Sequence, residues 1–110
     1  MPRPCKFRTV SHRPEAVYFK PRAIPLSLLD EVILTFDELE SLRLADLEER
    51  YQEEAAPRMG ISRQTFGNIL KVAHKKVADA LVNSKALRIE GGNIAISGDK
   101  RTNNCIRRIK

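Results

Sequence analysis

The stretch that most constrains this chain is residues 52–71, QEEAAPRMGISRQTFGNILK. Ala56 stands four positions before Gly60, and the apolar residues Phe66 and Ile69 follow that glycine by six and nine positions. Two short helices that cross steeply need a small residue where their backbones approach, and a residue without Cβ suits the turn between them. The spacing therefore predicts a helix-turn-helix, although a helical hairpin with a glycine turn and no nucleic-acid role fits the same pattern.

The second helix of this unit is expected to carry the functional side chains. Ser62 is a good N-cap, because its hydroxyl can accept a backbone N–H of the first turn. Polar side chains that point outward from that turn are the kind that contact base edges in the major groove. The base-contacting candidates are Arg63, Gln64, Thr65 and Asn68. The phosphate-contacting candidates are Arg58, Ser62, Lys71, Lys75 and Lys76.

Each base-contacting candidate has a preferred target. Arg63 pairs best with guanine, Gln64 and Asn68 with adenine, and Thr65 can touch a thymine methyl group. Each such pair discriminates by about 1–3 kcal/mol. For every one of these residues the alternative is a solvated surface side chain.

One residue disagrees with the first helix of the unit. Pro57 would lie inside that helix, where proline removes a hydrogen bond and costs about 3 kcal/mol. Tyr51 is also a poor N-cap. The pattern predicts this helix from about Gln52 to Met59, and Pro57 implies that it either starts later, near residues 53–54, or is kinked. We expect a local distortion and not the loss of the motif, because the glycine spacing downstream is intact.

Charge is strongly segregated along the chain. The formal net charge is +6, which favours a polyanionic partner. Residues 30–54, the acidic block, carry ten acidic and two basic residues, whereas residues 1–29 and 55–110 carry net charges of +5 and +9. The positive charge therefore coincides with the second helix of the predicted motif. The acidic block is expected to be the solvated face of two helices.

The sequence offers little for catalysis, metal binding or membrane insertion. It has no Ser-His-Asp or Cys-His pattern and no phosphate-binding glycine loop, so we expect a binding protein and not an enzyme. Cys5 and Cys105 lack metal-ligand spacing, which leaves a site shared with His12 or His74 across a dimer as the alternative to free thiols. No cofactor is expected, and no run of 18 apolar residues predicts a membrane helix.

The chain divides into three predicted parts. Residues 1–26 form a proline-rich basic arm with short strands at 7–10 and 16–19, which either tracks phosphates or is a terminus with incidental charge. Residues 27–88 form the helix-turn-helix domain. Residues 89–110 form a basic flexible tail, with short strands at 87–90 and 93–96 around a Gly-Gly-Asn turn. The expected fold is mainly α, a three-helix domain with possible short strands at both ends.

The helical domain has a recognisable start and a clear apolar periodicity. Residues 27–32 are expected to make a short helical turn, and Thr35 with Glu38 makes a capping box that opens a helix to about residue 47. The last helix should run from Ser62 to about residue 87. The expected buried positions are Phe36, Leu39, Leu42, Leu44, Ala45, Ala55, Ala56, Met59, Ile61, Phe66, Ile69, Leu70, Ala73, Val77, Ala80 and Leu81. The acidic side chains expected to face water are Asp37, Glu38, Glu40, Glu48 and Glu49.

Two strings, LTFDELESLRLADLE and ALRIEGGN, together with the start MPRPCKFR, resemble a family of small prokaryotic proteins that are predicted to bind DNA, domain of unknown function number 134. The resemblance covers about residues 1–94. The helical part is also similar to region 4 of sigma-70-type factors, which implies a sigma-like helix-turn-helix. The resemblance implies a cytoplasmic, nucleoid-associated prokaryotic protein. Pro57 and Tyr51 depart from the family pattern. Some relatives are joined to a domain like those that handle the nitrogenase iron–molybdenum cofactor, and no such domain is expected in this sequence.

Together these observations favour a transcriptional regulator that binds double-stranded DNA with the helix after Ser62. The rival from another class is a protein–protein adaptor whose acidic face, residues 37–54, contacts RNA polymerase without sequence-specific DNA binding. An RNA-binding or metal-linked regulator that uses the tails is a third alternative. A homodimer is left open, because one small unit gives limited specificity.

Overall fold

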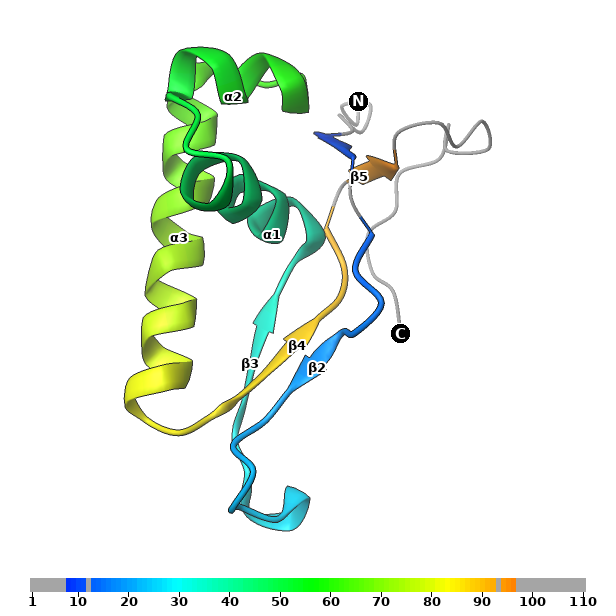
Figure 1. Ribbon diagram of the computed structural model, residues 1–110, viewed down its shortest axis with the longest axis vertical. Coiled ribbons are helices and arrows are strands. Elements are labelled where there is room, and N and C mark those ends of the chain that lie inside the picture. The colour runs from blue at the N-terminus through cyan, green and yellow to red at the C-terminus, as the bar shows by residue number, and fades with distance from the viewer. Residues whose placement is uncertain (1–7, 12, 93, 97–110) are drawn as a thin grey trace, which may run out of the picture.

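The protein is described here by a computed structural model that covers residues 8–11, 13–92 and 94–96 (Figure 1). Its strands are β1 (Arg8–Val10), β2 (Tyr18–Phe19), β3 (Glu31–Leu34), β4 (Ala86–Ile89) and β5 (Ile94–Ile96). Its helices are the 3₁₀ turn η1 (Leu26–Leu28), α1 (Phe36–Leu42), the π-helical turn η2 (Arg43–Leu47), α2 (Gln52–Met59) and α3 (Arg63–Val82). The fold is mainly helical with short strands at both ends, as the sequence predicts.

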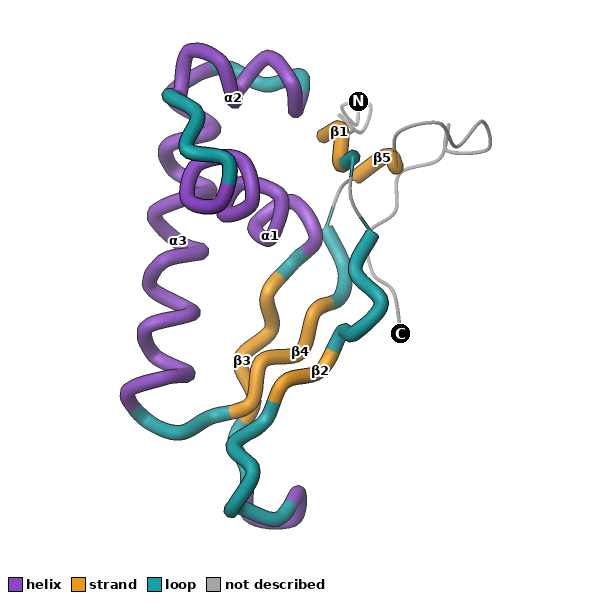
Figure 2. The backbone as a smooth tube through the Cα atoms, in the orientation of Figure 1, coloured by secondary structure: helices purple, strands orange, loops and turns teal. Residues whose placement is uncertain are grey.

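The helices form one long connection between two neighbouring strands. β3 and β4 are parallel, with Val32 opposite Leu87 and Leu34 opposite Ile89. β2 pairs antiparallel with the other edge of β4, giving the order β2-β4-β3. Figure 2 shows a second, smaller sheet in which β1 and β5 pair in parallel. β1 belongs to the predicted arm, residues 1–26, and β5 to the predicted tail, residues 89–110, so these two parts of the chain pair with each other. The division of the chain into three parts remains a prediction.

The capping box at the start of α1 is confirmed. The Thr35 hydroxyl accepts the Glu38 backbone N–H, and the Glu38 carboxylate accepts the Thr35 backbone N–H at 2.9 Å. These reciprocal bonds satisfy donors that a helix start otherwise leaves free. The helix continues to Leu47 as predicted, but its last turn widens, and the Glu48 N–H donates to the Arg43 carbonyl at 2.9 Å.

The turn between α2 and α3 has the geometry that the glycine spacing predicts. Gly60 adopts the left-handed conformation with φ 71° and ψ 31°. The Ile61 N–H donates to the Ala56 carbonyl at 3.1 Å, and the Gly60 N–H donates to the Pro57 carbonyl at 3.0 Å. This pair of bonds is a Schellman motif, which ends α2 and turns the chain into α3.

Pro57 does not delay or break α2. The helix starts at Gln52 and includes Pro57, and Tyr51 provides no side-chain cap. The carbonyl that loses its partner belongs to Glu53, and both Glu53 and Pro57 lie on the exposed face of the helix. Because water can bond that carbonyl, α2 has the predicted bounds Gln52–Met59, and the alternative of a later start is wrong.

Two apolar clusters form the core, and α3 contributes to both. The first lies between the sheet and the helices and consists of Val10, Leu34, Phe36, Ala73 and Ile89. The second lies inside the helix-turn-helix and consists of Leu44, Ala55, Ala56, Met59 and Phe66. Ile61, Leu70 and Ala45 pack against the second cluster, in agreement with the predicted core.

Two predicted helical segments are shorter than expected. α3 ends at Val82 and not near residue 87, because Ser84 takes a positive φ of 57° and the Lys85 N–H donates back to the Ala80 carbonyl at 2.8 Å. The chain then enters β4. Residues 27–32 contain only the end of η1, since β3 already begins at Glu31.

Two acidic residues that were expected to face water are buried. The exposed fractions are 7% for Asp37 and 3% for Glu40. Asp37 lies beside Arg8, and Glu40 bonds Ser11 and Arg43. These partners come from β1 and the chain after it or from the next helical turn, so the expectation of solvation is wrong for both carboxylates. Leu81, expected in the core, is exposed.

Candidate nucleic-acid interface

One face of α3 presents the predicted polar side chains to solvent. At about 100° per residue, Gln64, Asn68, Lys71 and Lys75 fall on the side of the helix opposite the buried Phe66. All four side chains are exposed. We call this set the α3 stripe. The structure thus brings two base-contacting candidates and two phosphate-contacting candidates onto one surface.

Arg63 and Thr65 lie on the two flanks of the α3 stripe. The guanidinium of Arg63 is 3.5 Å from the Glu53 carboxylate, and the two side chains are 65% and 68% exposed. An ion pair this exposed contributes about 0–1 kcal/mol, so a nucleic-acid group can displace Glu53 at little cost. Thr65 is half-buried, and its hydroxyl oxygen accepts the Ser62 hydroxyl at 2.9 Å.

Ser62 caps α3 as predicted. Its side-chain oxygen accepts the Thr65 backbone N–H at 3.1 Å while its hydroxyl proton goes to Thr65. Both of these hydrogen bonds of the Ser62 hydroxyl are therefore made to Thr65, in the first turn of α3. A phosphate at this position would instead meet the backbone N–H groups of the first turn, which have no partner inside a helix.

The other candidates for phosphate contact differ in whether their charge is already paired within the fold. Arg58 and Lys71 are exposed, and no carboxylate among the described residues lies within 4.0 Å of either. Lys76 is turned toward α1, where its Nζ lies 2.8 Å from the Glu38 carboxylate. The structure therefore does not join Lys76 to the other candidates, because an ion pair within the fold holds its ammonium group.

β1 adds a basic residue beside the turn. Arg8 lines a hollow of about 390 Å³ together with Pro57, Gly60, Ile61, Ser62 and Thr65. Its Nη1 lies 3.5 Å from Asp37, and its buried Nε has no hydrogen-bond partner among the described residues. Sequence reasoning placed Arg8 in the basic arm and not at the turn, because only the β1–β5 pairing and the contact of β1 with α2 bring it there.

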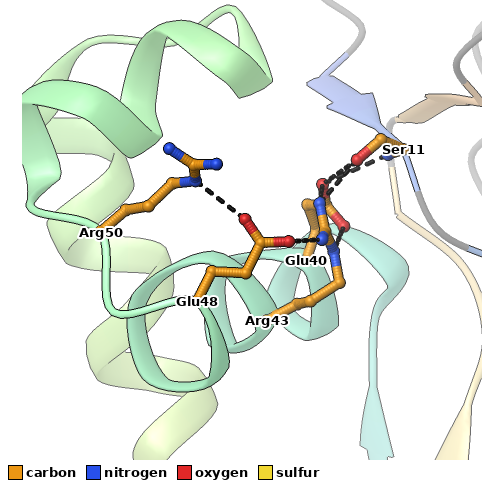
Figure 3. Close-up of polar contacts among 5 residues, drawn as sticks. All are labelled: Ser11, Glu40, Arg43, Glu48 and Arg50. Atoms are coloured by element: carbon orange, nitrogen blue, oxygen red, sulfur yellow. Dashed lines mark hydrogen bonds and ion pairs between the residues drawn. The ribbon is translucent and has the colours of Figure 1, made fainter.

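Much of the acidic block is used inside the fold. Figure 3 shows Glu40 held by Ser11 and Arg43, and Arg43 in turn paired with Glu48, which also accepts from Arg50 at 2.8 Å. Burial raises the pKa of Glu40, but hydrogen bonds from Arg43 and Ser11 outweigh burial and leave that pKa below its ordinary value. This carboxylate is therefore an ionised structural group.

Other acidic side chains are also paired. Glu38 bonds Lys76 and the Thr35 N–H, and the Asp46 carboxylate lies 2.7 Å from the His74 ring. Asp37, Glu38, Glu40 and Glu48 are thus bonded within the fold, whereas Glu49 and Glu54 are exposed without an ion pair among the described residues and Asp46 and Glu53 are in exposed pairs.

The described segments offer no metal centre. No group of three or more His, Cys, Asp or Glu side chains in residues 8–11, 13–92 and 94–96 is arranged to hold an ion. Cys5, Cys105 and His12 lie outside the described residues. None of the described helices is long and apolar enough to cross a bilayer.

Comparison with known proteins identifies relatives across most of the chain. The family described as protein of unknown function DUF134 matches residues 1–97. The UPF0251 protein of Caldanaerobacter subterraneus is 57% identical over 99 residues, which cover 90% of this chain and 84% of that protein. The UPF0251 protein of Desulfosudis oleivorans is 58% identical over 98 residues, which cover 89% and 71%.

A third relative is longer than this chain. The UPF0251 protein of Chlorobaculum tepidum is 49% identical over 105 residues, which cover 96% of this chain but only 53% of that protein. No solved structure matches the chain. The family match and these identities show that the chain belongs to the DUF134 family of proteins of unknown function.

Proposed function

We propose that this protein binds double-stranded DNA as a transcriptional regulator, with the first half of α3 in the major groove. The observation that carries the proposal is the α3 stripe beside the Gly60 turn. A helix-turn-helix places its second helix in the groove so that side chains near the N-terminus of that helix meet base edges. Gln64 and Asn68 occupy such positions, and Arg63 flanks them.

Electrostatics support the same face. Residues 63–78 of α3 contain four Lys or Arg and no acidic residue, and Arg58 and Arg8 lie near its start. Cations that contact phosphates release counterions from the duplex, and this release supplies much of the binding free energy at low salt. In this proposal Arg58, Lys71, Lys75 and Arg8 contact the backbone, and the protein acts at the chromosome in the cytoplasm.

The adaptor alternative has less support. Docking on a basic partner through residues 37–54 would require free carboxylates, yet Asp37, Glu38, Glu40 and Glu48 are bonded within the fold. Breaking those bonds would cost stability before any partner could gain from them. DNA binding relies on Arg58, Lys71 and Lys75, which lie within 4.0 Å of no carboxylate of the described residues, while Arg63 and Arg8 would exchange Glu53 and Asp37 for the nucleic acid.

The proposal is tested by selecting bound sequences from a pool of random duplexes over a salt series. Wild type is compared with the double variant Arg63→Ala/Gln64→Ala. Arg22→Ala is the matched control, because Arg22 is an exposed cation in the segment after β2, at the other end of the molecule (Figure 1). We expect wild type and Arg22→Ala to enrich one motif and the double variant to lose it.

Two results would contradict the proposal in different ways. Salt-sensitive binding without any enriched motif in the wild type would mean nonspecific association with DNA and no sequence recognition. Absence of binding even at low salt would exclude DNA as the partner and favour the adaptor, whose RNA polymerase contact could then be sought directly.

A further inference from the structure

Four segments meet at the end of the molecule opposite α2. Because β2 runs antiparallel and β3 parallel to β4, the end of β2, the start of β3 and the start of β4 lie together at one end of the sheet. Figure 1 shows the C-terminal end of α3 and the loop with η1 at this same end. The α3 stripe begins beside α2 and reaches Lys75, about two turns before the C-terminal end of α3.

This end exposes large apolar side chains. Four of them are between 54% and 75% exposed, and we call this set the distal patch: Phe19, Leu26, Leu28 and Leu81. Single exposed apolar residues are ordinary on protein surfaces. A group of four at one end is a mark of a binding surface, because soluble monomers rarely leave extended apolar patches in water.

The patch combines a projection with a groove. Leu26 and Leu28 project from η1 and contribute nothing to the core. At the same end of the molecule, a groove of about 280 Å³ is lined by Phe19, Pro21, Leu81 and Leu87 among others. A chain that carries both shapes at one end can place its projection in the groove of a second copy while receiving that copy's projection.

Lys20 and Asp30, two charged residues near the distal patch, suit the same reciprocal contact between two copies. Lys20, on the rim of the groove, is exposed and bonds only its neighbouring Pro21 carbonyl at 2.9 Å among the described residues. Asp30, which follows the projection, is also exposed, and no cation of the described segments lies within 4.0 Å of its carboxylate. A two-fold axis would set Lys20 of each copy against Asp30 of the other, giving two equal ion pairs.

We infer that the distal patch is the surface on which a second copy of this chain docks as a two-fold dimer. The leucines of η1 enter the groove between β2 and α3 of the partner, and the Lys20–Asp30 pairs fix the orientation. This inference does not depend on DNA binding, because no residue of the α3 stripe belongs to the distal patch or lines its groove.

The first test measures the mass of the full chain in solution by sedimentation equilibrium. The chain has a mass of 12.5 kDa, and we expect the wild type to sediment as twice that mass. The double variant Leu26→Asp/Leu28→Asp should be monomeric. Leu47→Asp is the control, because Leu47 is as exposed as the patch residues but lies on η2. It should remain dimeric, and circular dichroism should show all three proteins folded.

The second test exchanges the charges. Lys20→Asp and Asp30→Lys should each weaken the dimer by about fivefold or more, because each creates two like-charge contacts across the axis. The double exchange should restore the wild-type dissociation constant. A wild type that is still monomeric at about 1 mM would overturn the inference. A double leucine variant that dimerises like the wild type would overturn it as well, as would a double exchange that fails to restore association.

Discussion

Two glycines seven positions apart should respond in opposite ways to the same substitution. Gly60 forms the turn between α2 and α3 at φ 71°, and a Cβ there would meet only the Thr9 hydroxyl at 3.9 Å. Space is therefore ample, and the cost of Gly60→Ala is that of the left-handed backbone alone. That cost is about 1–2 kcal/mol for a residue with a Cβ.

Gly67 lies inside α3, where its backbone is that of an ordinary helix. A Cβ at Gly67 would lie 3.5 Å from the nearest atom, the Gln52 side-chain oxygen, which is an ordinary van der Waals contact. Gly67→Ala should therefore stabilise the protein by about 0.5–1 kcal/mol, because alanine loses less backbone freedom on forming a helix.

The assay is urea unfolding followed by far-ultraviolet circular dichroism for wild type and both variants. The midpoint should move down for Gly60→Ala and up for Gly67→Ala, with unchanged slopes. Gly60→Asn should cost less than Gly60→Ala, because asparagine tolerates the left-handed region. Equal stability of the wild type and Gly60→Ala would refute the turn geometry, and a destabilised Gly67→Ala would show that α2 and α3 approach more closely.

Three further predictions concern charge. Hydrogen bonds hold the folded-state pKa of Glu40 below its ordinary value of about 4.3. The ionised Glu40 carboxylate therefore stabilises the fold above that pH, and this stabilisation is lost as the pH falls through the lowered pKa. In Glu40→Gln the free energy of unfolding should fall less steeply on acidification. Lys71→Ala should reduce the salt dependence of DNA binding by about one unit of slope, whereas Lys76→Ala should not, as measured by fluorescence anisotropy. Glu53→Gln should raise DNA affinity by up to about fivefold in the same assay, because it frees Arg63 from its ion pair; lower affinity would contradict that account.

The sequence predicted the parts of the fold that depend on local chemistry. The capping box at Thr35, the cap at Ser62 and the turn at Gly60 each use residues within a few positions of one another. Such bonds form whenever the helix forms, so spacing alone identifies them. Helical periodicity also identified the exposed side of α3 that carries Gln64, Asn68, Lys71 and Lys75, although it wrongly placed Leu81 in the core.

The parts that were missed depend on contacts between distant segments. The bonds of β3 are made with β4, more than fifty residues later, and nothing local to residues 31–34 shows that pairing. The end of α3 was missed because Ser84, and not glycine, takes the left-handed position. The burial of Glu40 depends on Ser11, 29 residues earlier, so a carboxylate on a polar helix was expected to face water.

The central claim, that the first half of α3 contacts DNA, is tested most directly by nuclear magnetic resonance. A duplex enriched in the selection, or a random duplex if none is enriched, is titrated into ¹⁵N-labelled protein, and the shifted backbone amide signals are assigned to residues. The account predicts that the largest shifts fall in residues 58–71 and at Arg8, with little change in residues 37–49 or in the sheet. Shifts concentrated in residues 37–49, or spread without preference over the surface, would contradict it.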